Sequence, residues 1–291
     1  MSTSIDHIVV GVDGSAASKA AVDWAAREAS QRGVSLTLVH IAGGLGRTWS
    51  QTPPPAGFGD WQQRRGRDLI AEAAGIAEEA TRGANAVQVA TEMYYSSVIP
   101  TLVDMSKEAA MIVVGRRGAG TVGPLLGSVS SGLVHHAHCP VAVIHEEAAA
   151  TPHPAPAPVL VGIDGSPVSE LATAIAFDEA SRRNVNLVAL HAWSDTPLEF
   201  SDVEWSMMQA SEDAILAERL AGWQERYPEV TVHRDVVCDR PARQLVERSE
   251  EAQLVVVGSH GRGGFAGMLL GSVSSAVVQS VRTPVIVARQ K

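Results

Sequence analysis

Glycine and serine recur in a similar order in two parts of the sequence, and both parts suit the binding of an anion. Residues 255–275 read VVVGSHGRGGFAGMLLGSVSS, and residues 112–131 read IVVGRRGAGTVGPLLGSVSS. Glycine lets the backbone take positive φ and approach a ligand, so that successive amides form a nest for phosphate oxygens. The last serines open a helix, whose free N–H groups and dipole favour an anion. Ordinary turns followed by a serine N-cap are the alternative, but two copies in one context favour anion binding.

Both copies supply candidate phosphate-binding residues. In the first copy they are Gly115, Arg116, Arg117, Gly118, Gly120, Gly127, Ser128, Val129 and Ser130. In the second copy they are Gly258, Ser259, His260, Gly261, Gly263, Gly271, Ser272, Val273 and Ser274. His260 lies inside its loop, where it could contact phosphate, and Arg117 has the matching position in the first copy.

An aspartate ends a short apolar segment early in each half of the chain. Residues 8–15 read IVVGVDGS and residues 159–166 read VLVGIDGS. A carboxylate at the end of a first strand can accept hydrogen bonds from both ribose hydroxyls, as acidic residues do in dinucleotide-binding folds. An Asx turn or a helix cap, which needs no ligand, is the alternative. The candidates here are Gly11, Val12, Asp13, Gly162, Ile163 and Asp164.

These motifs occur in the same order in both halves, so the chain is an internal repeat with a period of about 150 residues. Each half ends on a similar apolar segment, CPVAVI at 139–144 and TPVIVA at 283–288. Residues 146–158, EEAAATPHPAPAP, lie between the halves, and alternating Ala-Pro favours extended polyproline geometry. We therefore expect a first nucleotide-binding domain at 1–146, a linker at 147–157 and a second such domain at 158–291.

Apolar segments alternate with amphipathic helical patterns in each half. After the first strand, we expect strands at 34–41, 85–91, 110–115 and 139–144, and at 185–192, 230–237, 253–258 and 283–288. Long helices are expected at about 61–82 and 203–227, and short ones at about 97–108 and 240–251. This alternation predicts an α/β chain of two tandem Rossmann-like, doubly wound domains, each with a five-stranded parallel sheet. In the common strand order 3-2-1-4-5, the aspartate turn and the glycine loop face each other across one crevice.

Composition narrows the classes of partner. The formal net charge is −9, which argues against nucleic acid. No apolar run is long enough to span a bilayer and the N-terminus has no signal-peptide pattern, so a cytoplasmic protein is expected. Cys139 and Cys238 have no disulfide or zinc spacing. The cluster of His135, His136 and His138 has no counterpart in the second half, which favours a surface role over a metal site.

The chain resembles the universal stress protein family in its tandem-domain form, which is common in actinobacteria. The signature G-2x-G-9x-G-[ST] is met by Gly258, Gly261, Gly271 and Ser272, and the family's first-strand aspartate by Asp13 and Asp164. The resemblance implies ATP as ligand, with Mg²⁺ as a possible companion. It also implies that adenine packs near the end of the second strand, around His40–Ile41 in one domain and His191–Ala192 in the other. Asp195 is a plausible further contact. It also implies homodimers that pair through the fifth strands, an as yet unknown protein partner, and a role in growth control or stress survival.

The first glycine loop departs from the family pattern. Only eight residues separate Gly118 from Gly127, one fewer than the pattern requires, and Pro124 stiffens the loop. We therefore expect the second site to bind more tightly than the first. The first half also has an extra segment at 43–61, which is either a lid, a partner site or loop decoration.

Several functions fit these residues, and a nucleotide-responsive regulatory module fits them best. No G-x-x-x-x-G-K-[ST] motif, paired catalytic carboxylates or nucleophile elbow occurs in the sequence. A slow ATPase is an alternative, although in-line hydrolysis needs Mg²⁺ and a residue that positions water, and no convincing candidate for that residue is found. An adenylating enzyme would need a substrate domain. A structural interaction protein with vestigial sites is the remaining alternative.

Overall fold

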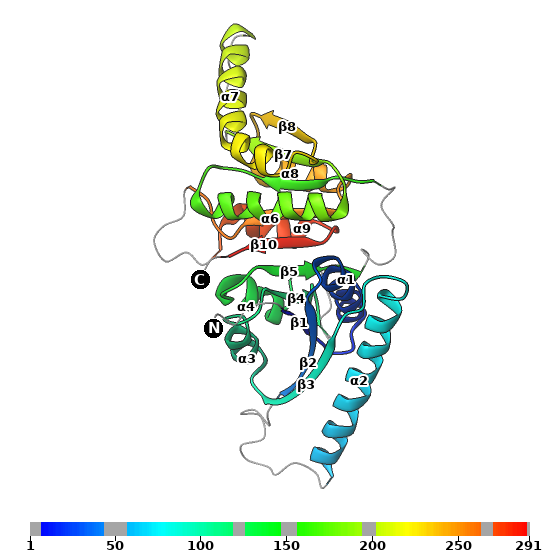
Figure 1. The fold of residues 1–291 in the computed structure, drawn as a ribbon. Helices are drawn as coiled ribbons and strands as arrows, with labels where there is room; N and C mark the ends of the chain where they lie inside the picture. The colour runs from blue at the N-terminus through cyan, green and yellow to red at the C-terminus, as the bar shows by residue number, and fades with distance from the viewer. Residues whose placement is uncertain are drawn as a thin grey trace. The chain divides into compact units, whose positions relative to one another are not determined.

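A computed structural model describes residues 7–43, 57–118, 126–146, 156–193, 202–262 and 270–289, without the side chains of 202–206. The chain divides between Ala149 and Ala150 into two compact units, which are described separately (Figure 1). Within each unit, strands and helices alternate along the chain.

The first unit is a doubly wound parallel sheet. Its elements are β1 (His7–Gly11), α1 (Ala16–Arg32), β2 (Ser35–Gly43), α2 (Phe58–Ala80), β3 (Val89–Ser96), α3 (Val98–Met105), β4 (Met111–Gly115), α4 (Ser128–His136) and β5 (Val141–Ile144). The strand order is β3-β2-β1-β4-β5, and every described pair is parallel. The order reverses between β1 and β4, which is where such sheets bind ligands.

The second unit repeats this topology. Its elements are β6 (Val159–Gly162), α6 (Pro167–Arg183), β7 (Leu187–Ala192), α7 (Asp202–Arg226), β8 (Val232–Val237), α8 (Pro241–Ser249), β9 (Leu254–Gly258), α9 (Ser272–Ser280) and β10 (Val285–Ala288). The strand order is β8-β7-β6-β9-β10, again parallel throughout. The predicted class, two tandem Rossmann-like α/β domains with the order 3-2-1-4-5, is confirmed.

The core of each sheet consists of its short apolar strands. β4 and β9 have four consecutive buried residues each before the final glycine, because helices cover both faces of the sheet. In the first unit, α1 packs against α2 on one face and α3 packs against α4 on the other (Figure 1). This arrangement leaves the carboxyl ends of the strands as the place where loops of different origin meet.

Local signals fix the first helix of each unit. Ser15 and Ser166 are the N-caps of α1 and α6, and their side chains accept hydrogen bonds from the amides three residues later. Gly33 and Asn184 end these helices in the left-handed conformation, which glycine and asparagine tolerate best. The Asp-Gly-Ser turns are therefore held between a buried strand and a capped helix.

The third strand of the first unit lies later in the sequence than predicted. The prediction was 85–91, whereas β3 covers Val89–Ser96 and pairs with the whole of β2 from Leu36↔Val89 to Gly43↔Ser96. The residues before it form a turn after α2, in which Gly83 has φ +81° and the amide of Ala84 donates to the carbonyl of Thr81. The apolar residues of that turn resemble the start of a strand in sequence.

Candidate functional site

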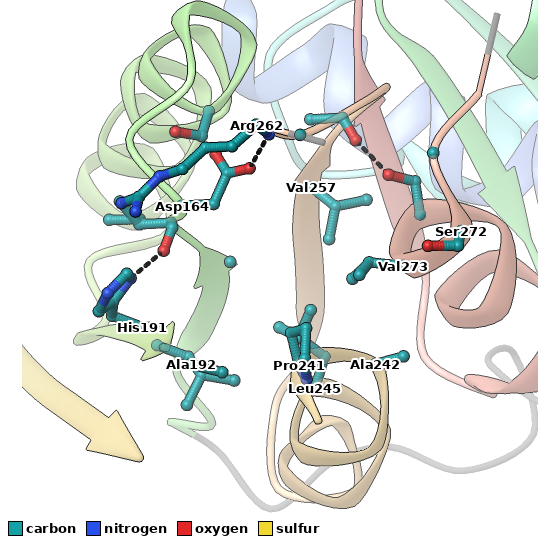
Figure 2. Close-up of a pocket in the computed structure, with 18 of the residues that line it drawn as sticks. Asp164, His191, Ala192, Pro241, Ala242, Leu245, Val257, Arg262, Ser272 and Val273 are labelled. Carbon is teal, nitrogen blue, oxygen red and sulfur yellow. Dashed lines mark hydrogen bonds between the residues drawn. The ribbon is translucent and has the colours of Figure 1, made fainter. Parts of the chain in front are cut away.

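A crevice of about 800 Å³ opens at the carboxyl ends of β6, β7 and β9 in the second unit. The start of α8 and the start of α9 complete its walls, as Figure 2 shows with Pro241 and Ala242 on one helix and Ser272 and Val273 on the other. Its volume is within the range of roughly 300–1,000 Å³ that is typical of small-molecule sites.

Most of the residues predicted for the second site lie in this crevice. The predicted residues that line it are Gly162, Ile163, Asp164, Ala192, Gly258, His260, Gly261, Gly271, Ser272, Val273 and Ser274. Ser259 is different, because it is buried behind the loop, with its hydroxyl 3.1 Å from Nδ1 of His260. Asp195 and Gly263 lie outside the described residues.

Asp164 joins the first turn of the unit to the glycine loop. Its Oδ1 accepts a hydrogen bond of 2.9 Å from the amide of Ser166, which forms the Asx turn that the sequence allowed. Its Oδ2 accepts one of 2.9 Å from the amide of Arg262, on the far side of the crevice (Figure 2). A carboxylate offers about four lone-pair sites, so Asp164 still has acceptor capacity for a ligand.

Opposing effects set the charge state of Asp164. Burial disfavours its ionised form, but hydrogen bonds from Ser166, from the Arg262 amide and from Ser169 outweigh burial and hold the pKa of Asp164 below its ordinary value. The carboxylate is therefore negatively charged at neutral pH.

Two glycines of the loop occupy positions where a Cβ would be crowded. A Cβ on Gly261 would overlap Oδ2 of Asp164, and a Cβ on Gly271 would lie 3.1 Å from Cα of His260. The loop therefore packs its backbone directly against the carboxylate and against itself. This close packing is the geometry of a backbone cradle, and it explains why the sequence has glycine at both positions.

The start of α9 faces the crevice without a capping side chain. Gly271 is its N-cap, and its own amide donates to the carbonyl of Ser259 at 2.7 Å, which closes the loop. The first amides of α9 are thus left to solvent or to a ligand, in contrast to the serine-capped start of α6. One expected donor differs: the hydroxyl of Ser274 donates to the carbonyl of Gly258 at 2.5 Å and anchors the helix to β9.

The opposite end of the crevice is mainly apolar. It is formed by Ala192 and by side chains that the sequence analysis did not select: Leu190, Pro241, Ala242, Leu245 and Val257. His191 also lines it, with Nδ1 2.6 Å from the carbonyl oxygen of Ile163 (Figure 2). A ligand with a flat apolar part and an anionic part matches this division.

The remaining lining residues were also missed, and they add positive charge. Arg240 precedes α8 and Arg262 follows Gly261, and both are exposed at the crevice. Asp164 supplies the one carboxylate among the described residues that line it. The other missed residues are Ser169, Trp193 and Ala276. In a doubly wound sheet, the helix after the third strand, here α8, begins near the switch point. The residues at the start of this helix could therefore have been predicted as lining residues.

Known proteins match both units. The sequence model of the Universal stress protein family matches residues 4–145 and again residues 157–289. The chain belongs to the universal stress protein family. A universal stress protein of Mycobacterium tuberculosis (strain H37Rv) is 59% identical over 285 residues, which cover 97% of this chain and 96% of that protein. One from Mycobacterium bovis is 56% identical over 285 residues, with 97% of each chain covered.

Solved structures extend the likeness to the fold. The crystal structure of a universal stress protein from Archaeoglobus fulgidus superimposes with a TM-score of 0.69 at 20% sequence identity, covering 98% of this chain and 97% of that one. At this identity the likeness shows the shared fold alone.

The first universal stress protein domain repeats the contact between aspartate and glycine loop. Oδ1 of Asp13 accepts from the amide of Ser15 at 2.9 Å, and a Cβ on Gly118 would lie 2.6 Å from Oδ2 of Asp13. The amide of Gly127 donates to the carbonyl of Arg116 at 2.9 Å, so the shorter loop is closed by the same bond as the longer one. The shortening therefore lies between two matched ends.

The other predicted residues of the first domain are placed as follows. Gly11 faces Val114 and Leu102, and the carbonyl of Val12 lies 2.8 Å from Nδ1 of His40. Ile41 lies on β2, where it pairs in register with Tyr94 of β3. Gly115 packs on the first turn of α1, and the hydroxyl of Ser130 donates to the carbonyl of Arg116 at 2.8 Å. Ser128 and Val129 open α4, whose N-cap Gly127 makes no side-chain bond.

Arg116, Arg117 and Gly118 line a separate, smaller hollow beside the start of α1. Gly120 is outside the described residues. Among the residues that the structure describes, no group of three or more His, Cys, Asp or Glu residues is placed to hold a metal ion. No described helix combines the length and the apolar character that a membrane crossing requires.

Proposed function

We propose that this universal stress protein binds ATP in the crevice of its second domain and acts as a nucleotide-dependent regulatory switch in growth control or stress survival. The observation that carries the proposal is the division of the crevice. One end has the uncapped start of α9 and the glycine backbone, and the other is lined by Ala192, Pro241 and Leu245. Adenine fits the apolar end and phosphates fit the cradle.

The ribose and the phosphate chain have distinct places in this proposal. The ribose hydroxyls lie against Asp164, which keeps acceptor capacity on both oxygens. Arg240 and Arg262, with His260, favour a ligand with several negative charges, which is the reason for proposing ATP rather than AMP or cyclic AMP. Mg²⁺ would reach the site with the phosphates, because oxygen ligands from the phosphates suffice for it.

Binding rather than hydrolysis is the proposed role. In-line hydrolysis needs a group that positions the attacking water. Asp164 is the one carboxylate among the described lining residues, and both of its oxygens are engaged by backbone amides. A switch then requires that nucleotide binds two conformational states with different affinity.

The first experiment is a count of nucleotide in protein purified without added nucleotide. The protein is denatured, and the released small molecules are separated by ion exchange and identified by mass. We expect close to one ATP per chain, held by the second domain. Asp164→Ala should remove it, whereas the matched Asp13→Ala variant should leave it in place. Equal losses in the two variants would contradict the assignment to the second domain. Absence of nucleotide, together with no binding of added ATP and Mg²⁺, would refute nucleotide binding.

We also propose, from the family resemblance, a cytoplasmic homodimer with a further protein partner. Sedimentation velocity with and without ATP tests the dimer, because a nucleotide-dependent change between monomer and dimer alters the weight-average sedimentation coefficient. A monomer under both conditions would remove dimerisation from the proposal while leaving the nucleotide site untouched.

A further inference from the structure

A second polar hollow, of about 110 Å³, lies in the first unit. Ser15, Ala16 and Ala17 form one wall, the start of the glycine loop forms another, and His145 and Glu146 after β5 complete it. Residues at the matching positions 166–168 and 289 do not line the crevice of the second unit. The hollow is therefore a different place from the proposed nucleotide site, and the inference below is independent of that proposal.

The groups around the hollow favour negative charge. It adjoins the N-terminus of α1, a helix of 17 residues with no acidic side chain in its first turn. Helix geometry leaves the amides of Ala16 and Ala17 without partners inside the helix, while the amide of Ser18 donates to Oγ of Ser15. Arg116 and Arg117 add two positive charges, and the opposing charges are the exposed Glu146 and Asp13, which lies against Ser15 and Gly118.

His145 is the second, independent observation. His145 lines the hollow, the residue is 2% exposed, and its Nε2 has no hydrogen-bond partner among the described residues. Burial, followed by the charges of Arg116 and Arg117, lowers the pKa of His145 to about 3. The ring is therefore neutral and keeps one N–H donor. Buried polar nitrogens are nearly always paired, so this one calls for an acceptor.

The second unit has replaced these groups. Pro167, which has no N–H, stands where the first unit has Ala16, and Ser259 stands where it has Arg116. His260 and Arg289 replace Arg117 and His145. The positive charges and the buried imidazole thus occur together in the first unit, although the two units share their topology. A shared structural need of the fold does not account for them.

We propose that this hollow binds a small tetrahedral oxyanion, with inorganic phosphate as the simplest representative. The start of α1 and the Arg116 and Arg117 side chains attract it, and His145 donates its ring N–H. A hollow of this size holds one such anion or a few water molecules. The anion is either free phosphate or the terminal phosphate of a nucleotide bound to the first unit, and these sources share the same chemistry.

The test follows the ring nitrogens of His145 by two-bond ¹H–¹⁵N NMR in the full-length chain, with His145→Gln to assign the signal. Inorganic phosphate is added at constant ionic strength, with chloride as the reference anion. We expect a saturable shift of the His145 signal. Arg116→Ser, which installs the residue of the second unit, should weaken the apparent affinity at least tenfold. Arg82→Ser removes the same charge from an exposed site at the end of α2 and should change nothing.

Two results would overturn the proposal. The absence of a saturable shift in the wild-type chain would mean that water alone fills the hollow. Equal affinities in Arg116→Ser and Arg82→Ser would mean that phosphate responds only to overall charge. If the site holds, competition identifies the source of the anion. Displacement of phosphate by ATP but not by adenosine assigns the site to the phosphate chain of a nucleotide, and a lack of displacement by ATP assigns it to free phosphate.

Discussion

Nδ1 of His191 lies 2.6 Å from the carbonyl oxygen of Ile163, and the first unit repeats this pair with His40 and Val12 at 2.8 Å. A carbonyl oxygen only accepts, so Nδ1 carries the proton in both rings. Nε2 of His191 lies 3.3 Å from a carboxylate oxygen of Glu212 on α7. The imidazole thus ties the end of β7 to the residue that precedes Asp164.

Replacement of His191 by phenylalanine should weaken binding at the second site. The change removes the hydrogen bond to Ile163 and leaves a buried carbonyl without this partner, a loss of about 1–1.5 kcal/mol, or roughly tenfold in affinity. Titration calorimetry with ATP measures it. The matched His40→Phe variant changes the other unit and should leave the affinity of the second site as it is. Equal weakening in both variants would mean that the effect comes from general destabilisation.

Gly261→Ala should abolish nucleotide binding while lowering the melting temperature of the protein only slightly. The new Cβ would overlap Oδ2 of Asp164, so either the carboxylate or the loop must move. Gly222→Ala is the control in the same unit, because Gly222 lies near the end of α7 and a Cβ there meets nothing within 4 Å. It should raise stability by up to about 1 kcal/mol through helix propensity. Thermal unfolding and ATP titration of both variants separate the two effects.

Asp164→Asn should make the free energy of unfolding depend less on pH in the acidic range. The pKa of Asp164 is lowered in the folded chain, so the native state binds this proton less readily than the unfolded state. The stabilisation is complete above the ordinary value of 3.8 and is lost as the pH falls through the folded pKa. We expect the melting temperatures of the wild type and Asp164→Asn to differ at neutral pH and to converge in acid. A constant difference would contradict the charge argument.

His145 should make the chain sensitive to mild acid. Its pKa is lowered from 6.5 to about 3 by burial and by the charges of Arg116 and Arg117, with Glu146 and Asp13 as the opposing charges. Below pH 6.5 the unfolded chain takes up this proton and the native chain does not. Stability therefore falls with pH, by at most about 1.4 kcal/mol per pH unit from this group.

Urea unfolding between pH 7.5 and 5 in phosphate-free buffer measures this effect. His145→Gln should lose less stability than the wild type over that interval, and Tm values should show the same order. Parallel profiles for the two proteins would contradict the lowered pKa.

The fold followed from signals that are local in sequence. Short apolar strands that end in Asp-Gly-Ser or glycine, each followed by a helix, allow few topologies other than a doubly wound sheet. The boundaries were less accessible. β3 starts later than predicted because pairing with β2, not the composition of residues 85–88, decides where it begins.

The parts of the candidate site that backbone atoms form could be predicted from the sequence, whereas several of its side-chain walls could not. Glycines 258, 261 and 271 signal the loop by their identity, because a Cβ at each of these positions would be crowded by neighbouring atoms. Arg240 and Leu245 reach the crevice through the crossover from β8 to β9, and no local pattern marks them. No local pattern predicts that Arg116 and His145 line the same hollow either, because they come from segments after two different strands.

The hydrogen bond between Asp164 and the Arg262 amide would change when a nucleotide occupies the crevice. This carboxylate links the glycine loop to the first turn of the second unit. In the proposed ATP complex, a ribose hydroxyl would compete for Oδ2 and weaken this bond, while the phosphates would hold the loop at the start of α9. Amide hydrogen exchange at Arg262 would then depend on whether a phosphate oxygen replaces Asp164 as the acceptor, and nucleotide binding would not simply slow it. A change of hydrogen-bond partner at Arg262 would then give the proposed protein partner a local difference between the two states to recognise.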